Sequence, residues 1–153
     1  MKFKLLATLA LIAPLFFVTS VKAENPQDVQ KLLSTGACVD CNLSGADFTG
    51  AHLIGADLRG ANLQGANLAN ANLEGADLTR ANLTGANLTS AFVTNANFQN
   101  ANLDKVNFTQ ATIYDANVNG ASMNDLTITD AEIFNTGIGI GGDEGELNVT
   151  PWD

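Results

Sequence analysis

A five-residue repeat runs through most of this chain and limits the folds that are open to it. Consecutive segments at 56–60, 61–65 and 66–70 read ADLRG, ANLQG and ANLAN. Stepping by five from Leu43 to Ile138 gives 20 repeat centres, and each centre is Leu, Phe, Ile, Val or Met. Two positions before the centre, the residue is Ala in 16 of the 20 repeats. We expect both columns, the centres and their small partners, to face inward.

The five-residue period matches neither common amphipathic element, because an α-helix repeats about every 3.6 residues and a strand every 2. It fits a four-sided coil. In such a coil, each five-residue side points its centre and small partner inward and leaves its other three positions outside. Successive coils then stack, so that residues one full turn apart lie above each other. The period alone therefore predicts a solenoid.

The repeats resemble the motif of the pentapeptide-repeat family, Ala-(Asp/Asn)-Leu-X-X, and residues 41–138 match it without a break in phase. The resemblance implies an all-β fold, a right-handed quadrilateral β-helix of about five coils, with the solenoid at residues 41–140. At about 4.8 Å between strands, five coils make a rod about 24 Å long. Leu fills all the centres over 53–88, whereas Ile, Val and Met fill those over 113–138. We expect the first half to be the more regular.

Residues 24–40 are expected to form a short capping helix and a linker. Asn25 suits the N-cap, and Pro26 suits the first turn. The apolar residues of this segment fall on one helical face; they are Val29, Leu32 and Leu33. Such a helix would cover the first coil and prevent edge-to-edge strand pairing. The alternative is a helix that docks a partner.

Residues 141–153 are predicted to be an acidic tail, because Asp143, Glu144 and Glu146 follow a glycine-rich stretch. Two arrangements are open for it. In one, Trp152 folds back over the last coil, and in the other the tail is disordered.

The first 23 residues have the three parts of a secretory signal, with a basic start, an apolar run and a small-residue cleavage site. An uncleaved anchor is the alternative, but the run of about 14 apolar residues is shorter than the roughly 20 that a spanning helix needs. We expect cleavage after Ala23, export, and no membrane attachment afterwards. The resemblance to signal-bearing family members suggests the periplasm or the thylakoid lumen.

The formal charge of the chain is −9, and cleavage would remove three lysines and bring it to −12. So acidic a protein is excluded as a nucleic-acid binder that works by neutralising phosphates. Binding to anionic lipid headgroups is disfavoured for the same reason.

Cys38 and Cys41 form the one motif with chemical meaning. Asn42 stands where a haem-attachment motif requires His, and a lone pair of thiols without a second pair or a nearby His is a poor zinc site. In an exported protein, a disulfide that ties the capping helix to the first coil is the favoured interpretation. Free thiols and a redox pair are the alternatives.

No catalytic constellation is expected. The one His, His52, falls at an outward position, and the Ser and Asp residues near it are themselves repeat positions. We predict no enzyme activity, no cofactor and no metal site.

One side of the unrolled coil differs from the other three, which carry mostly Asn, Asp, Thr and Ser. Its first exposed column is Ile54, Glu74, Thr94, Tyr114 and Phe134. Its second is His52, Asn72, Phe92, Thr112 and Glu132. The interface candidates are Ile54, Phe92, Tyr114 and Phe134, and the rings of Tyr114 and Phe134 are expected to stack on adjacent coils. The alternative is that the C-terminal tail folds over these residues and covers them.

Three functions remain open at this point. The first is a non-catalytic structural or protein-interaction module with an unknown partner or with self-association. The second is an acidic DNA mimic that inhibits a topoisomerase, as some members of the resembled family do; export argues against it. The third is a thiol redox carrier that uses Cys38 and Cys41.

Overall fold

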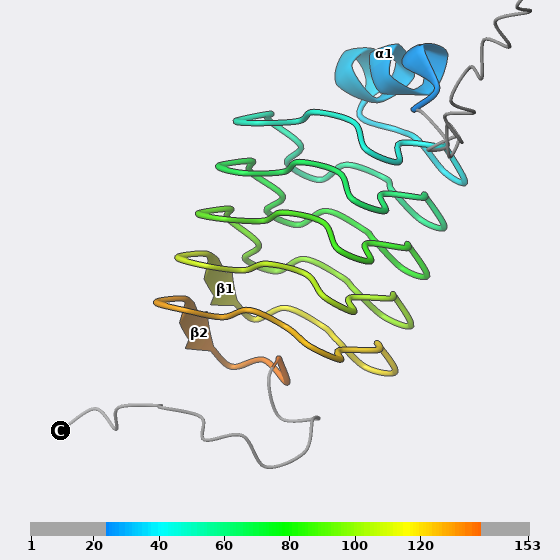
Figure 1. The fold of residues 1–153 in the computed structure, drawn as a ribbon. Helices are drawn as coiled ribbons and strands as arrows, with labels where there is room; N and C mark the ends of the chain where they lie inside the picture. Colours follow the sequence, from blue (N-terminus) through cyan, green and yellow to red (C-terminus); the bar gives the residue numbers. More distant parts are fainter. Residues whose placement is uncertain (1–23, 139–153) are drawn as a thin grey trace, which may run out of the picture.

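The computed structural model describes residues 24–138, and Figure 1 shows them as a stack of similar coils with a helix at one end. The helix, α1, spans Pro26–Thr35. Two short strands, β1 (Thr112–Tyr114) and β2 (Glu132–Phe134), lie at the far end of the stack. The predicted leader at 1–23 and the predicted tail at 141–153 lie outside the described residues.

The coils are joined by parallel backbone pairing between residues 20 apart. Asn42 pairs with Asn62, and Asn62 pairs with Asn82. The N–H of Leu63 donates to the carbonyl of Asn82 (2.7 Å), and the N–H of Asn82 donates to the carbonyl of Ala61 (2.9 Å). Four five-residue sides therefore complete one turn, as the repeat predicts.

Regular strand is nearly absent from the described residues, because each side is too short to hold it. Between one side and the next, the N–H of Ala66 donates to the carbonyl of Leu63 (3.0 Å), which closes a turn. The residue at the turn takes a positive φ, as at Gly65 (64°) and Asn70 (59°). Only one bridge per side remains, except where Ile113 of β1 pairs in register with Ile133 of β2. The predicted β-helix is thus made of isolated bridges more than of strands.

Positive φ recurs at every fifth residue, and this explains the corner composition. Gly and Asn adopt this region at the lowest cost. Lys105 (60°) and Gln110 (57°) adopt it as well, where the sequence has no glycine to offer. The corner conformation is therefore imposed by the coil and merely favoured by the residue.

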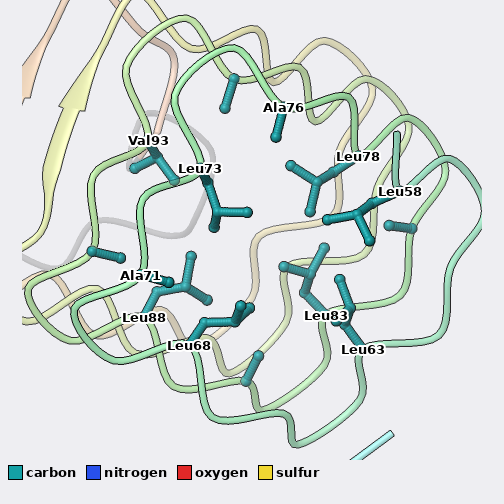
Figure 2. Packing of buried hydrophobic residues seen from close by; sticks show 14 of the residues in the cluster. Leu58, Leu63, Leu68, Ala71, Leu73, Ala76, Leu78, Leu83, Leu88 and Val93 are labelled. Carbon is teal, nitrogen blue, oxygen red and sulfur yellow. The ribbon is translucent and has the colours of Figure 1, made fainter. Parts of the chain in front are cut away.

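The centres and their alanine partners fill the interior of the coil. Figure 2 shows Leu and Ala side chains from several sides pointing inward. Leu63, Ala66 and Leu73 are fully buried. The small alanine leaves room for the leucines at the same level, which gives a core packed by one repeating contact. This confirms the two inward columns.

Burial weakens toward the last described coil. The centres Val118, Met123, Ile128 and Ile133 are only partly buried, whereas those before them are closed off from solvent. Within residues 24–138, this coil has a neighbouring coil on one side only. The expectation that the first half is more regular agrees with this burial.

The ladder begins one repeat earlier than residue 41. The N–H of Asp57 donates to the carbonyl of Gly36 (2.8 Å), and Ala37 pairs with Asp57. Cys38 occupies the position of a centre and is fully buried. The sequence pattern missed this repeat because it has Cys where the motif has Leu and Gly where it has Ala.

Helix α1 has the predicted start. The side-chain oxygen of Asn25 accepts from the N–H of Gln27 (3.1 Å), and Pro26 opens the first turn. Gly36, at φ 69°, ends the helix and donates to the carbonyl of Leu32 (2.8 Å). Both ends of the helix are therefore satisfied by local hydrogen bonds.

Helix α1 lies over the first coil. The N–H of Asn25 donates to the carbonyl of Asn42 (3.0 Å), whose own N–H donates to the carboxylate of Asp28 (2.9 Å). Leu32 is 1% exposed and belongs to the core, as expected of a capping helix. Leu33 differs from the prediction, because it is 59% exposed and points away from the coil. The one-residue step from 32 to 33 turns the side chain by about 100°.

Candidate interaction surface

We call the side formed by repeats centred on Leu53, Leu73, Val93, Ile113 and Ile133 the aromatic side. Backbone pairing stacks its residues at the predicted spacing, since His52 pairs with Asn72 and Asn72 pairs with Phe92. Its large apolar groups stand out from the rod, with Ile54 60%, Phe92 51% and Phe134 66% exposed. Tyr114 is half-buried. All four interface candidates therefore share one surface.

Tyr114 and Phe134 touch on adjacent coils, but they do not stack. Their ring centroids are 6.3 Å apart and their planes are perpendicular. This edge-to-face geometry suits the ring quadrupoles. The Tyr114 hydroxyl donates to the Glu132 carboxylate (2.7 Å), which raises the pKa of Tyr114. That hydrogen bond orients the tyrosine ring, and the two rings meet edge to face instead of stacking as predicted.

Two other sides carry ladders of amides. Asn62 donates through its side-chain nitrogen to Asn42 (3.3 Å), and Asn82 donates in the same way to Asn62 (3.3 Å). On the next side, Asn87 donates to Asn67 (3.0 Å). In these ladders the side-chain amides hydrogen-bond to each other along the rod. Fewer of their donors and acceptors are therefore open to a partner than the number of Asn residues suggests.

The side that carries Asp57 and Asp77 has its charge partly compensated. The Arg59 guanidinium lies 2.7 Å from Asp57 and 3.9 Å from Asp77. The hydrogen bond from Arg59 lowers the pKa of Asp57, and Asp57 in turn raises the pKa of Arg59. In the next two coils this column continues with Asn97 and Asn117. The side therefore carries no continuous stripe of carboxylates.

Near the far end the amide ladder gives way to a carboxylate contact, because Ser122 pairs with Asn102 at the next ladder position and bonds to Asp104. One of its oxygens accepts from the Ser122 hydroxyl (2.5 Å), from the backbone N–H of Asn124 (2.9 Å) and from its side-chain nitrogen (3.0 Å). These bonds, with that of Ser122 the largest cause, lower the pKa of Asp104. The carboxylate thus joins two coils.

Stability is expected to fall in acid because of such carboxylates. The pKa is also lowered at Asp47, chiefly by the Thr49 hydroxyl, and at Asp57. The unfolded chain then binds protons first, so this stabilisation is complete above the unfolded pKa of about 3.9 and is lost as pH falls through the lower folded values. Urea unfolding from pH 6 to about pH 2.5 should show a falling midpoint, with a shallower fall in Asp104→Asn. An equal acid response in this variant would contradict the assignment.

Cys38 and Cys41 lie beneath α1. Their sulfur atoms are 2.09 Å apart, at disulfide distance. They lie on the first two sides of the coil, where Cys38 is a centre and Cys41 is the small partner of the next centre, Leu43. A bond between them therefore joins two inward positions, and the expectation that it ties the helix to the coil was wrong. The helix contacts it without a covalent link, with the Lys31 nitrogen 4.0 Å from the Cys41 sulfur.

The remaining sequence predictions concern His52, metal binding and membrane attachment. His52 is exposed on the aromatic side. Among residues 24–138, no group of three or more His, Cys, Asp or Glu side chains is arranged to hold a metal ion. The same residues contain no helix that is long and apolar enough to cross a membrane.

The family model for pentapeptide repeats matches the chain with 8 copies, at residues 41–80, 56–95 and 94–125. No curated protein is similar enough to match. Among solved structures, a pentapeptide repeat protein from the Arabidopsis thaliana thylakoid lumen is 37% identical with a TM-score of 0.58, over 72% of this chain and 72% of that one.

Two cyanobacterial pentapeptide repeat proteins are similar at lower scores. One, from Cyanothece 51142, is 25% identical over 72% of this chain and 97% of its own, with a TM-score of 0.37. The other, from Nostoc sp. strain PCC 7120, is involved in heterocyst differentiation regulation and is 25% identical over 69% of this chain and 67% of its own, with a TM-score of 0.35. The family match, the thylakoid-lumen structure and the 20-residue pairing agree. The chain belongs to the pentapeptide-repeat family, whose members form right-handed β-helices.

Proposed function

We propose that this protein is a non-catalytic protein-interaction module of about five coils, which binds its partner through the aromatic side. The observation that carries this proposal is the clustering of Ile54, Phe92, Tyr114 and Phe134 on one side of an otherwise polar rod. Exposed aromatic residues gathered in this way are typical of interaction surfaces. The rigid coil holds them at a fixed spacing, so little conformational entropy is lost on binding.

The proposed compartment is the thylakoid lumen or the periplasm. The signal-like pattern at 1–23 supports export, and the similar protein from the Arabidopsis thylakoid lumen supports a lumenal location. A disulfide between Cys38 and Cys41 is consistent with an oxidising compartment.

Intact mass of the exported protein tests both the cleavage of the leader and the disulfide. We expect loss of residues 1–23 and no alkylation until a reductant is added, and two freely alkylated thiols would contradict the disulfide.

Two other functions receive less support. A topoisomerase-inhibiting DNA mimic needs a stripe of negative charge, but Arg59 partly compensates the acidic side and Asn97 continues it. A thiol redox carrier needs an accessible sulfur, but Cys38 is fully buried and Cys41 is 5% exposed beneath α1.

The interaction proposal is tested with a double substitution on the aromatic side. Tyr114→Thr with Phe134→Thr removes both rings and places β-branched threonines, which suit strands, in β1 and β2. The matched control is Gln99→Thr with Asn119→Thr, which lie 20 residues apart on another side and are also exposed. Cross-linked complexes from the protein's own compartment, identified by mass spectrometry, should persist in the control and disappear in the double variant. Complexes retained by a folded double variant would refute the proposed surface.

A further inference from the structure

We propose that the partner of the aromatic side is a second copy of this chain, bound face to face with the two rods antiparallel. This inference rests on the proposed function, because it names the partner for the same surface. The two-fold axis would lie in the interface and cross the aromatic side at Phe92 and Thr94, on its middle coil.

This axis determines which residues meet. When a two-fold axis runs across the side, each column of one chain faces the same column of the other chain, and the order of the coils is reversed. The column of Ile54 thus faces the column of Ile54 in the other chain, and the same holds for the column of His52. The first coil of one chain meets the fifth coil of the other, the second meets the fourth, and the two middle coils meet each other.

The apolar residues then meet one another. Ile54, 60% exposed, lies opposite Phe134 of the other copy, 66% exposed, and this contact occurs twice. Phe92, 51% exposed, lies opposite Phe92 of the other copy at the axis. The three residues with the largest exposed apolar groups of this side are therefore all covered in one arrangement, which removes their side chains from water.

The polar residues match in the same arrangement. His52 lies opposite Glu132 of the other copy, so that an imidazole N–H faces a carboxylate acceptor. Glu74 is the exception, because it lies opposite Tyr114 of the other copy, whose hydroxyl proton is already donated to Glu132 of that copy. Asn72 lies opposite Thr112. No two carboxylates oppose each other.

The parallel arrangement fails the same test. An axis along the rod would place the column of Ile54 against the column of His52. His52 would then face Ile54, and Glu132 would face Phe134. The Glu132 carboxylate would lose water without gaining a hydrogen-bond partner, which costs free energy. The sequence of the aromatic side therefore favours the antiparallel pair.

The area sets the expected strength. A side about 24 Å long and about 15 Å wide covers roughly 350 Å² per copy. Stable complexes bury about 800 Å² per partner. We therefore expect a weak, concentration-dependent dimer with a dissociation constant of about 10 µM to about 1 mM.

Sedimentation equilibrium of the exported chain, with charge variants, tests the pairing. His52→Glu places like charges opposite each other and should weaken association about fivefold. Adding Glu132→Lys to this variant restores opposite charges and should recover the association. Gln99→Glu adds the same charge on another side and should change little. Equal association of His52→Glu and Gln99→Glu would overturn the proposal.

Cross-linking tests the register. Thr94→Cys lies at the proposed axis and should form an intermolecular disulfide under a mild oxidant, whereas Gln99→Cys, on another side, should not. Equal cross-linking of both variants would overturn this register.

The outcomes separate this inference from the proposed function. A wild-type protein that stays monomeric to about 1 mM, but forms cross-linked complexes with another protein that depend on Tyr114 and Phe134, refutes the second copy and leaves the surface intact. Self-association and cross-linked complexes that are both unchanged by the double substitution of Tyr114 and Phe134 refute both.

Discussion

Leu73→Asp is expected to lower the free energy of unfolding by about 3–5 kcal/mol. Leu73 is a fully buried centre in the first half of the rod. Its neighbours are the leucine and alanine columns, which offer a carboxylate neither a hydrogen bond nor a counter-charge. Because each coil is stabilised by the coils next to it, the damage should also reduce the cooperativity of unfolding.

The control is the adjacent residue. Glu74 is exposed on the aromatic side, and Glu74→Ala should change the unfolding free energy by less than about 0.5 kcal/mol. Thermal and urea unfolding followed by circular dichroism measures both variants. Similar stability of the two would contradict the assignment of inward and outward columns.

Leu32→Ala is expected to cost about 2–4 kcal/mol and to loosen the cap. Leu32 is 1% exposed and is the buried anchor of α1. Without its contacts the helix should leave the first coil, where the N–H of Asn25 and the carboxylate of Asp28 now bond to Asn42. Hydrogen exchange at the amides of α1 should accelerate together with the loss of stability.

Leu33→Ala provides the comparison on the same helix. Leu33 is 59% exposed, so its truncation should change stability and exchange little. Equal effects of the two substitutions would mean that α1 does not cap the coil through Leu32.

Most of the fold follows from the five-residue period, because each repeat forms one side of the coil. The inward columns, the 20-residue pairing and the amide ladders were all predictable, since each depends on a position in the repeat and not on neighbours far away. The start of the ladder was not predictable in the same way. Cys38 occupies a centre by virtue of its place in the coil, although the motif there is degenerate.

The details that the sequence did not predict depend on single side chains. The perpendicular rings of Tyr114 and Phe134 reflect the hydrogen bond to Glu132, which lies in the other column. The outward direction of Leu33 follows from its place one residue after Leu32, which is the helix residue that the coil buries. The place of the disulfide follows from the earlier start of the ladder. None of these is set by the repeat itself.

Nuclear magnetic resonance at increasing concentration of the exported protein tests the central claim most directly. Between about 10 µM and about 1 mM, pairing of two copies should shift the amide signals along the aromatic side, at 52–54, 92–94 and 132–134. The amide signals of Asn62, Asn67 and Asn97, which represent the other three sides, should stay in place. Shifts confined to those three sides or to α1, with the aromatic side unchanged, would contradict association through the aromatic side.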